Sequence, residues 1–223
     1  RVDSHGKIID SPNRATITLG SAEGAVGLGS AAQLDLRAGS DVTVGGRPGQ
    51  NDGTPRGTLK IDVPRLGSND AAIAAATGLR IDGAADIQLN GVRRYDDAPL
   101  ATTADVRGNR AQLVTQQWLD QVVDPHSVAW IDGALDNADL QQRTRALGDV
   151  RLRPGVQVLA RRSDANPDGD LTIAGDIDLS GYRYGPEANR ADPSRRGFGE
   201  SASLVLRAEG NINVYGSIND GFA

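Results

Sequence analysis

Residues 169–185 read GDLTIAGDIDLSGYRYG and contain the pattern that decides the fold. Leu171 and Ile173 flank a polar threonine, and a short turn follows. Ile177 and Leu179 then flank an aspartate. Because alternation of apolar and polar residues with period two is typical of a strand with one buried face, the stretch predicts two short strands joined by a turn.

The same pattern returns along the chain. Its first strands recur about every 20 residues where nothing intervenes, which is a spacing typical of repeat architectures. Each unit is too small to bury its own apolar face, so the units must stack. The sequence therefore predicts an all-β fold of the β-solenoid type. The further copies are 34–36 with 42–45, 79–81 with 87–91, 150–152 with 156–158, and 204–206 with 212–216.

The alternation also predicts which side chains form the core. One aliphatic residue from each clear copy is expected to point inward, because most of its neighbours are polar or charged. The five residues expected to form one aliphatic column are Leu36, Ile81, Leu152, Ile173 and Leu206.

Composition narrows the class of protein. The 223 residues include no Met and begin at Arg1, so we expect residues 1–223 to be a single solenoid segment of a longer chain. There are 25 Asp against 4 Glu, a bias that suits frequent turns. A net charge of −5 argues against nucleic acid as a partner. No apolar run approaches the roughly 18 residues of a membrane span, and the absence of cysteine excludes disulfides and thiolate chemistry.

Residues 111–148 interrupt the alternation and predict a helical excursion. Val114, Trp118 and Val122 are spaced four apart, with Asn109 as a candidate N-cap and Pro125 as a candidate stop. A second helix is expected from Asp136 to Gly148. Both tryptophans, Trp118 and Trp130, lie here, and they either seal the helices onto the sheet or form a platform for a sugar or a partner.

Four polar stretches follow the second strand of the pattern: 45–57, 91–110, 161–170 and 181–201. They contain six of the ten prolines, which favours loops over strands. If all four leave one corner of the coil, they form a composite surface suited to acidic glycans or proteins; otherwise they decorate a stalk. The candidate binding residues of this surface are Arg93, Arg94, Tyr95, Arg161, Arg162, Tyr182, Tyr184, Arg195 and Arg196.

One loop has the spacing of a cation site. Asp164, Asn166 and Asp168 lie at alternating positions before Gly169, as in the first half of a calcium-binding loop. Gly175 stands where such a loop carries its bidentate acid, so a turn without a metal is the competing interpretation. Calcium is the only cofactor that the sequence suggests.

The sequence carries no motif that predicts catalysis. The outward positions of the clear copies carry only two acids, Asp35 and Asp178, several rungs apart. A glycosidase needs two carboxyl groups within about 5–9.5 Å. Histidine occurs only at His5 and His126, too few for a relay or a His-rich metal site. The sequence therefore predicts a protein that is not an enzyme.

Three stretches carry a resemblance to a known family. They read LRPGVQV within 148–158, GDLTIAGDIDLSGYRYG in 169–185, and LRAEGNINVYGSINDGF within 204–222. Together they resemble the large exoproteins of the filamentous haemagglutinin family, in the region beyond the central repeats. Those exoproteins carry an Asn-Pro-Asn-Gly motif in an N-terminal secretion domain. The similar string here, Asn166 to Gly169, lies deep in the chain, so this piece is not expected to be that domain.

The resemblance implies a right-handed parallel β-helix with a short helical insertion. It also implies two-partner secretion of the parent chain through an outer-membrane transporter, and a place outside the bacterium or on its surface. The expected function is that of a non-enzymatic adhesin segment, associated with virulence, whose partner is a glycan or protein on a host or bacterial cell. The alternatives are a β-helix polysaccharide lyase or glycosidase, and a spacer of a contact-dependent inhibition exoprotein.

Overall fold

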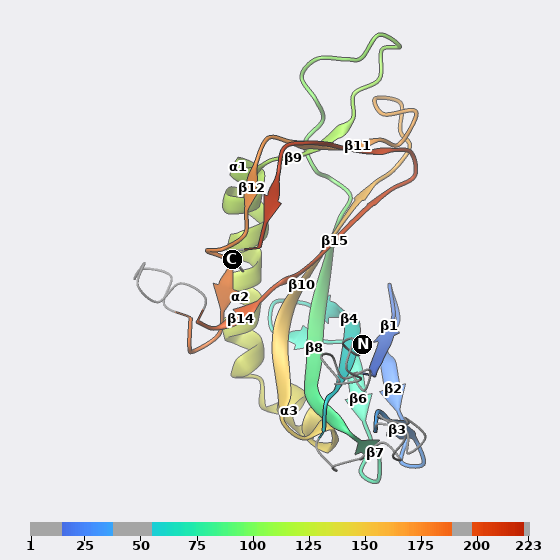
Figure 1. The fold of residues 1–223 in the computed structure, drawn as a ribbon, viewed down its shortest axis with the longest axis vertical. Helices are drawn as coiled ribbons and strands as arrows, with labels where there is room; N and C mark the ends of the chain where they lie inside the picture. Colours follow the sequence, from blue (N-terminus) through green and yellow to red (C-terminus); the bar gives the residue numbers. More distant parts are fainter. Residues whose placement is uncertain (1–14, 38–54, 189–197, 221–223) are drawn as a thin grey trace, which may run out of the picture. The chain divides into compact units, whose positions relative to one another are not determined.

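The computed structural model describes residues 15–37, 55–188 and 198–220, and strands predominate over helices in them. The chain divides into two compact units (Figure 1). Unit 1 comprises Arg1–Pro64, Ala72–Leu89 and Ala138–Arg151. Unit 2 comprises Arg65–Ala71, Asn90–Asn137 and Leu152–Ala223. Three strands contribute residues to both units: β4 (Gly57–Leu66), β8 (Ala84–Tyr95) and β10 (Val150–Ala160).

Unit 1 contains two successive turns of three strands. The first turn is β1 (Thr16–Gly20), β2 (Val26–Leu28) and β3 (Gln33–Asp35). Each of its strands pairs in parallel, in the same order, with the next turn, which is β4, β6 (Ile73–Ala75) and β7 (Arg80–Asp82). The sheet continues from β4 to β8. Strands of one turn therefore lie on the equivalent strands of the next.

Unit 2 repeats this arrangement. Here β10, β11 (Leu171–Ala174) and β12 (Ile177–Asp178) pair in parallel with β15 (Ser203–Ala208), β16 (Ile212–Tyr215) and β17 (Ile218–Asn219). On its other edge β11 pairs with β9 (Gln112–Val114), and β10 lies beside β8. Two antiparallel pairs complete the strands: β13 (Arg183–Tyr184) with β14 (Glu200–Ser201), and β5 (Asp70–Ala71) with the end of β4.

The length of a turn differs from the sequence prediction. Residues paired across consecutive three-strand turns, such as Thr16 with Thr58 or Leu171 with Ile212, lie 41–48 positions apart, and not about 20. The reason is that all strands of a turn carry the same apolar alternation. The prediction of a repeat of about 20 residues therefore assigned neighbouring strands of one turn to successive turns.

The core is aliphatic, as the alternation predicts, but it is not one column. Leu36 and Ile173 are fully buried, whereas Ile81, Leu152 and Leu206 are half-buried. Ile173 stacks between Val114 and Val214, because β11 lies between β9 and β16. Leu206 pairs instead with Val158, and Ile81 with Leu34. The register thus distributes the five residues over different stacks.

Helices occupy most of the predicted excursion. They are α1 (Gln116–Trp118), the π-helical turn η1 (Leu119–Val123), α2 (Asp124–Leu135), α3 (Ala138–Thr144) and the 3₁₀ turn η2 (Arg145–Leu147). Gly148 ends the last turn with φ of 81°, as expected for a glycine stop. Residues 112–114 form a strand and not part of the helix.

Two predicted helix signals are wrong. The N-cap is Thr115, whose hydroxyl accepts from the Trp118 N–H at 3.2 Å, and not Asn109. Pro125 does not stop the helix either, because it lies in the first turn of α2, directly after η1. There the Asp124 N–H bonds to the Leu119 carbonyl in the π-helical pattern. Proline is tolerated at such a position because its missing N–H needs no helical partner.

Both tryptophans are buried in unit 2 and pack against the sheet. Trp118 meets Tyr95 edge to face, with ring centroids 5.5 Å apart. Trp130 lies against Gly91, and its Nε1–H donates to the Asp70 carbonyl at 3.0 Å. Since neither ring is offered to solvent, their role is to seal the helical segment.

Arg65 connects α2 to the sheet of unit 2 through hydrogen bonds. Its guanidinium donates to the carbonyl oxygens of Gly91, His126 and Gly155 at 2.8–3.2 Å and lies 4.8 Å from the Trp130 ring centroid. Burial lowers the pKa of Arg65 to about 10, and the side chain remains charged at neutral pH. One part-buried cation thus joins β4, β8, β10 and α2. In the described residues no helix is long and apolar enough to cross a membrane.

Candidate functional site

Two of the four predicted loops lie side by side in unit 2. The Arg110 N–H donates to the Ala165 carbonyl at 2.9 Å, and Arg107 pairs with the Asp168 carboxylate at 2.9 Å. Figure 1 shows segments 96–110 and 161–170 meeting beyond β9 and β11. The first loop follows β8 and the second follows β10, and these two strands are neighbours in one sheet.

The four loops do not share one corner. The loop that begins at Gly181 follows β12, which pairs with β17 in a sheet separate from that of β8 and β10. The stretch 45–57 follows a third strand, β3, but most of it lies outside the described residues. Arg195 and Arg196 lie outside them as well. The prediction treated every loop as following the same strand, which the turn length does not allow.

The four described arginines of the predicted surface are exposed. Arg161 lies 4.0 Å from the Asp96 carboxylate, and the Arg93 guanidinium lies 5.2 Å from the Tyr95 ring centroid. The backbone N–H of Arg162 donates to a Glu209 carboxylate oxygen at 3.0 Å. Acidic side chains therefore accompany the arginines at this corner and reduce its net positive charge.

The predicted tyrosines do not form a surface with these arginines. Tyr95 and Tyr184 are buried, and their hydroxyls bond to His126 Nδ1 at 3.1 Å and to the Asp124 carboxylate at 2.9 Å. Tyr182 is half-buried, and its hydroxyl donates to Asp120. Burial of a tyrosine ring is favourable when its hydroxyl has a hydrogen-bond partner. The helical segment supplies that partner for all three tyrosines.

The predicted calcium loop is held by its own hydrogen bonds. Asn166 is fully buried; its amide donates to the Asp170 carbonyl at 2.9 Å and accepts from the Asp170 N–H at 3.0 Å. The Asp168 carboxylate meets Arg107 and Asn109, while Asp164 lies on the exposed part of the loop. Over the described ranges no group of three or more His, Asp or Glu side chains is placed to hold a metal. A calcium ion here stays a prediction.

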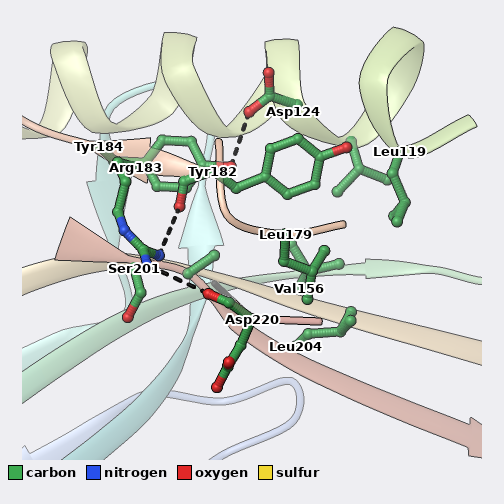
Figure 2. Close-up of a pocket in the computed structure, with 12 residues that line it drawn as sticks. Leu119, Asp124, Val156, Leu179, Tyr182, Arg183, Tyr184, Ser201, Leu204 and Asp220 are labelled. Atoms are coloured by element: carbon green, nitrogen blue, oxygen red, sulfur yellow. Dashed lines mark hydrogen bonds between the residues drawn. The ribbon is translucent and has the colours of Figure 1, made fainter. Parts of the chain in front are cut away.

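A pocket of about 160 Å³ lies in unit 2 between the helical segment and the strands β10, β13, β14 and β15 (Figure 2). Five aliphatic side chains line it, and Leu119, Leu179, Val156 and Leu204 gather on one side in the view of Figure 2. Val123 completes the aliphatic wall, one π-helical turn after Leu119. Because η1 has the wider π-helical turn, it brings Leu119, Val123 and Asp124 to the same wall.

The polar side of the pocket is formed by Arg183, Ser201 and Asp220 (Figure 2). Arg183 is only 6% exposed. Its guanidinium donates to two backbone carbonyl oxygens, that of Tyr182 at 3.5 Å and that of Asp220 at 3.3 Å. Both distances exceed the usual range of about 2.7–3.2 Å for N–H···O bonds. The pocket thus combines an aliphatic wall with a buried cation.

Sequence reasoning identified Tyr182 and Tyr184 as functional candidates but missed this pocket. In the sequence pattern Leu179 and Leu204 lie in predicted strands, and Leu119 and Val123 lie in the predicted helical excursion. Their convergence depends on the helix lying over β13, which no local pattern indicates. The one signal in the sequence is the cluster Tyr182, Arg183 and Tyr184, a cation between two aromatic rings directly after a predicted strand.

Searches with this chain found no matching family model, no matching curated protein and no matching solved structure.

Proposed function

We propose that this chain is a non-enzymatic segment of a secreted, surface-associated adhesin similar to the filamentous haemagglutinin exoproteins. Its backbone is a right-handed parallel β-helix, and its exposed loops contact a glycan or protein on another cell. The parent chain leaves the bacterium through an outer-membrane two-partner secretion transporter. The contact site is the corner formed by 96–110 and 161–170 with the arginines beside it.

The observation that carries this proposal is the stacking of three-strand turns. In each unit every strand of one turn pairs in parallel, in the same order, with the next turn. Connections between parallel strands of one sheet are right-handed in about 98% of cases, which favours a right-handed coil. A stack of this kind holds loops at fixed corners, and insertions on one face of a repeat protein often form its binding surface.

The chemistry of the corner favours an acidic ligand or a mixed protein surface. Arg161 and Arg162 are exposed there, Arg93 and Arg94 are exposed near the end of β8, and all four offer planar, charged donors that match carboxylate and sulfate. Acidic neighbours of these arginines, including Asp96, weaken the electrostatic attraction between the arginines and an acidic ligand. We therefore expect recognition to depend on the shape of the ligand as well as on its charge.

A glycan array and a cell-binding assay test the proposal. The chain and a variant with Arg93, Arg94, Arg161 and Arg162 changed to Gln are compared at two salt concentrations. A matched control carries Arg37→Gln and Arg80→Gln, which remove two exposed, ion-paired arginines of unit 1. We expect binding by the chain and the control, loss in the corner variant, and weaker binding at higher salt, because exposed charges are screened beyond about 8–10 Å.

Two other results would point elsewhere. Equal absence of binding in all three proteins would favour a spacer of a contact-dependent inhibition exoprotein. Release of reducing ends or unsaturated products from pectin or glycosaminoglycan, abolished by one Asp substitution, would favour a β-helix polysaccharide lyase or glycosidase. Either result contradicts the adhesin proposal.

A further inference from the structure

The pocket of unit 2 has the dimensions of a site for a small molecule. Its volume is about 160 Å³, and a water-sized group occupies roughly 10–15 Å³ of such volume, so it accommodates roughly ten non-hydrogen atoms. Drug-sized pockets are several times larger, at about 300–1,000 Å³. A ligand of this pocket is therefore small.

The apolar wall requires a ligand with a hydrocarbon body. Leu119, Val156, Leu179 and Leu204 present only methyl and methylene groups to the pocket (Figure 2). The nearby tyrosine hydroxyls are engaged by helix carboxylates, Tyr182 by Asp120 and Tyr184 by Asp124. Moving apolar ligand surface from water to this wall is favourable in free energy, so the part of a ligand that contacts the wall is expected to be hydrocarbon.

The other end of the pocket favours a negative group. The guanidinium of Arg183 lines it, is nearly inaccessible to bulk solvent, and presents planar donors in a fork that matches a carboxylate. A ligand carboxylate would add a charge-assisted bond, which is stronger than the bonds of 3.3 and 3.5 Å that the guanidinium makes to the backbone carbonyls of Asp220 and Tyr182. Ser201 lines the same end and can donate one further hydrogen bond.

Two acids also line the pocket, and their placement is compatible with such a ligand. The Asp124 carboxylate of α2 accepts from the Tyr184 hydroxyl of β13 at 2.9 Å, which engages one of its oxygens. Asp220 is exposed, and in Figure 2 its carboxylate points away from Tyr182 and Tyr184. Its backbone oxygen, and not its carboxylate, accepts the 3.3 Å bond from Arg183.

We propose that this pocket binds a small monocarboxylate with an apolar body, such as a medium-chain fatty acid. The carboxylate pairs with Arg183, and the hydrocarbon lies along Leu119, Val156, Leu179 and Leu204. The site is separate from the corner loops, and the inference does not rest on the adhesin function.

Isothermal titration calorimetry of the whole chain with octanoate tests the site. Octanoate has about ten non-hydrogen atoms, which matches the volume of the pocket. We expect one site per chain with a dissociation constant of roughly 10 μM to 1 mM, the range open to a ligand of this size. Octylamine and 1-octanol have the same body without the negative charge, and we expect both to bind at least about tenfold more weakly.

Two variants separate the charge from the shape of the pocket. Arg183→Gln is expected to bind octanoate and 1-octanol equally, at least about tenfold below the unaltered affinity for octanoate. Ala202→Leu adds three carbon atoms to the lining of the pocket and is expected to abolish binding of all three probes. Arg94→Gln, at an exposed position that does not line the pocket, is the matched control and is expected to bind octanoate unchanged. Circular dichroism checks that each variant is folded.

Three results would overturn the proposal. The first is no saturable octanoate binding up to about 5 mM. The second is octylamine binding as tightly as octanoate. The third is full octanoate binding by folded Ala202→Leu. The first two need no variant, so a folding defect of Arg183→Gln does not leave the proposal untested.

Discussion

Gly91 is a position where only hydrogen fits. A Cβ there would overlap the ring of Trp130, which is itself buried and hydrogen-bonded to the Asp70 carbonyl. We expect Gly91→Ala to lower the free energy of unfolding by about 1–3 kcal/mol, the usual cost of overpacking a closed core. The measurement is urea unfolding.

Gly27→Ala is the matched control for this substitution. Gly27 also lies in a strand, and a Cβ there would have nothing within 4 Å. We expect its free energy of unfolding to change little. Equal losses in the two variants would contradict the contact between Trp130 and the strand.

Arg65 is a part-buried cation of unit 2, and its removal is predicted to lower stability. Arg65→Met would leave the carbonyls of Gly91, His126 and Gly155 without this donor while preserving most of the volume. An unsatisfied buried polar group costs about 1–3 kcal/mol, so we expect at least that loss in the free energy of unfolding. Arg80→Met removes an exposed ion pair and should cost less than about 1 kcal/mol.

His126 makes stability depend on pH. Burial, and then the nearby Arg93 and Arg65, hold the pKa of His126 below its ordinary value of 6.5. The folded state therefore prefers the neutral ring, whose Nδ1 is hydrogen-bonded with the Tyr95 hydroxyl. The unfolded state binds a proton first as pH falls through 6.5, so the stabilisation present above that pH is lost below it. Urea unfolding at pH 7.5 and 5.5 should show this loss. His126→Gln should show less of it, and an unchanged pH dependence would contradict this role.

At the scale of elements, carboxylates at the corners link one turn to the next. Asp176 accepts from the backbone N–H and the hydroxyl of Ser217, both at 2.8 Å, and Asp170 accepts from the Asn211 N–H at 2.7 Å. The hydrogen bonds from Ser217 hold the pKa of Asp176 below its usual range. Each acid lies 41 residues before its partner, which is the separation of the strands these corners connect.

We predict that Asp176→Ala lowers the melting temperature, because it removes a connection between turns. Asp105→Ala is the matched control. The pKa of Asp105 is also lowered, but the backbone N–H groups that bond to its carboxylate, those of Asn109 and Arg107, belong to its own loop. Thermal unfolding followed by circular dichroism should show a larger shift for Asp176→Ala. A larger shift for Asp105→Ala would contradict the role of the corners.

Local sequence signals predicted some elements well and others poorly. The helical excursion and its end at Gly148 followed from composition and spacing, because glycine at positive φ is a local requirement. The wrong stop at Pro125 has a physical cause. The π-helical turn before it supplies a position where proline needs no N–H, and such turns have no sequence signature.

At the scale of the whole molecule, the sequence predicts that strands stack but not how many make one turn. The apolar alternation is the same at Leu34, Leu59 and Leu171, which belong to the third, first and second strands of their turns. Loop positions depend on that assignment, which is why the four loops were expected at one corner. The pocket was missed for a related reason, since Leu119 and Leu204 meet only through the fold.

Cysteine cross-linking tests the central claim, the stacking of three-strand turns, most directly. The chain contains no cysteine, so engineered pairs report without interference. Thr172 and Asn213 are register partners on β11 and β16, 41 residues apart. Paired strands lie about 4.8 Å apart, within the Cα separation that a disulfide spans. Tyr215 lies two residues further along β16, which places its Cα roughly 8 Å from Thr172, beyond the reach of a disulfide.

Mild oxidation followed by non-reducing mass spectrometry gives the result. The stacking account predicts rapid disulfide formation in the Thr172→Cys, Asn213→Cys pair and little in the Thr172→Cys, Tyr215→Cys pair. Failure of the first pair to cross-link, or equal cross-linking of both, would contradict it.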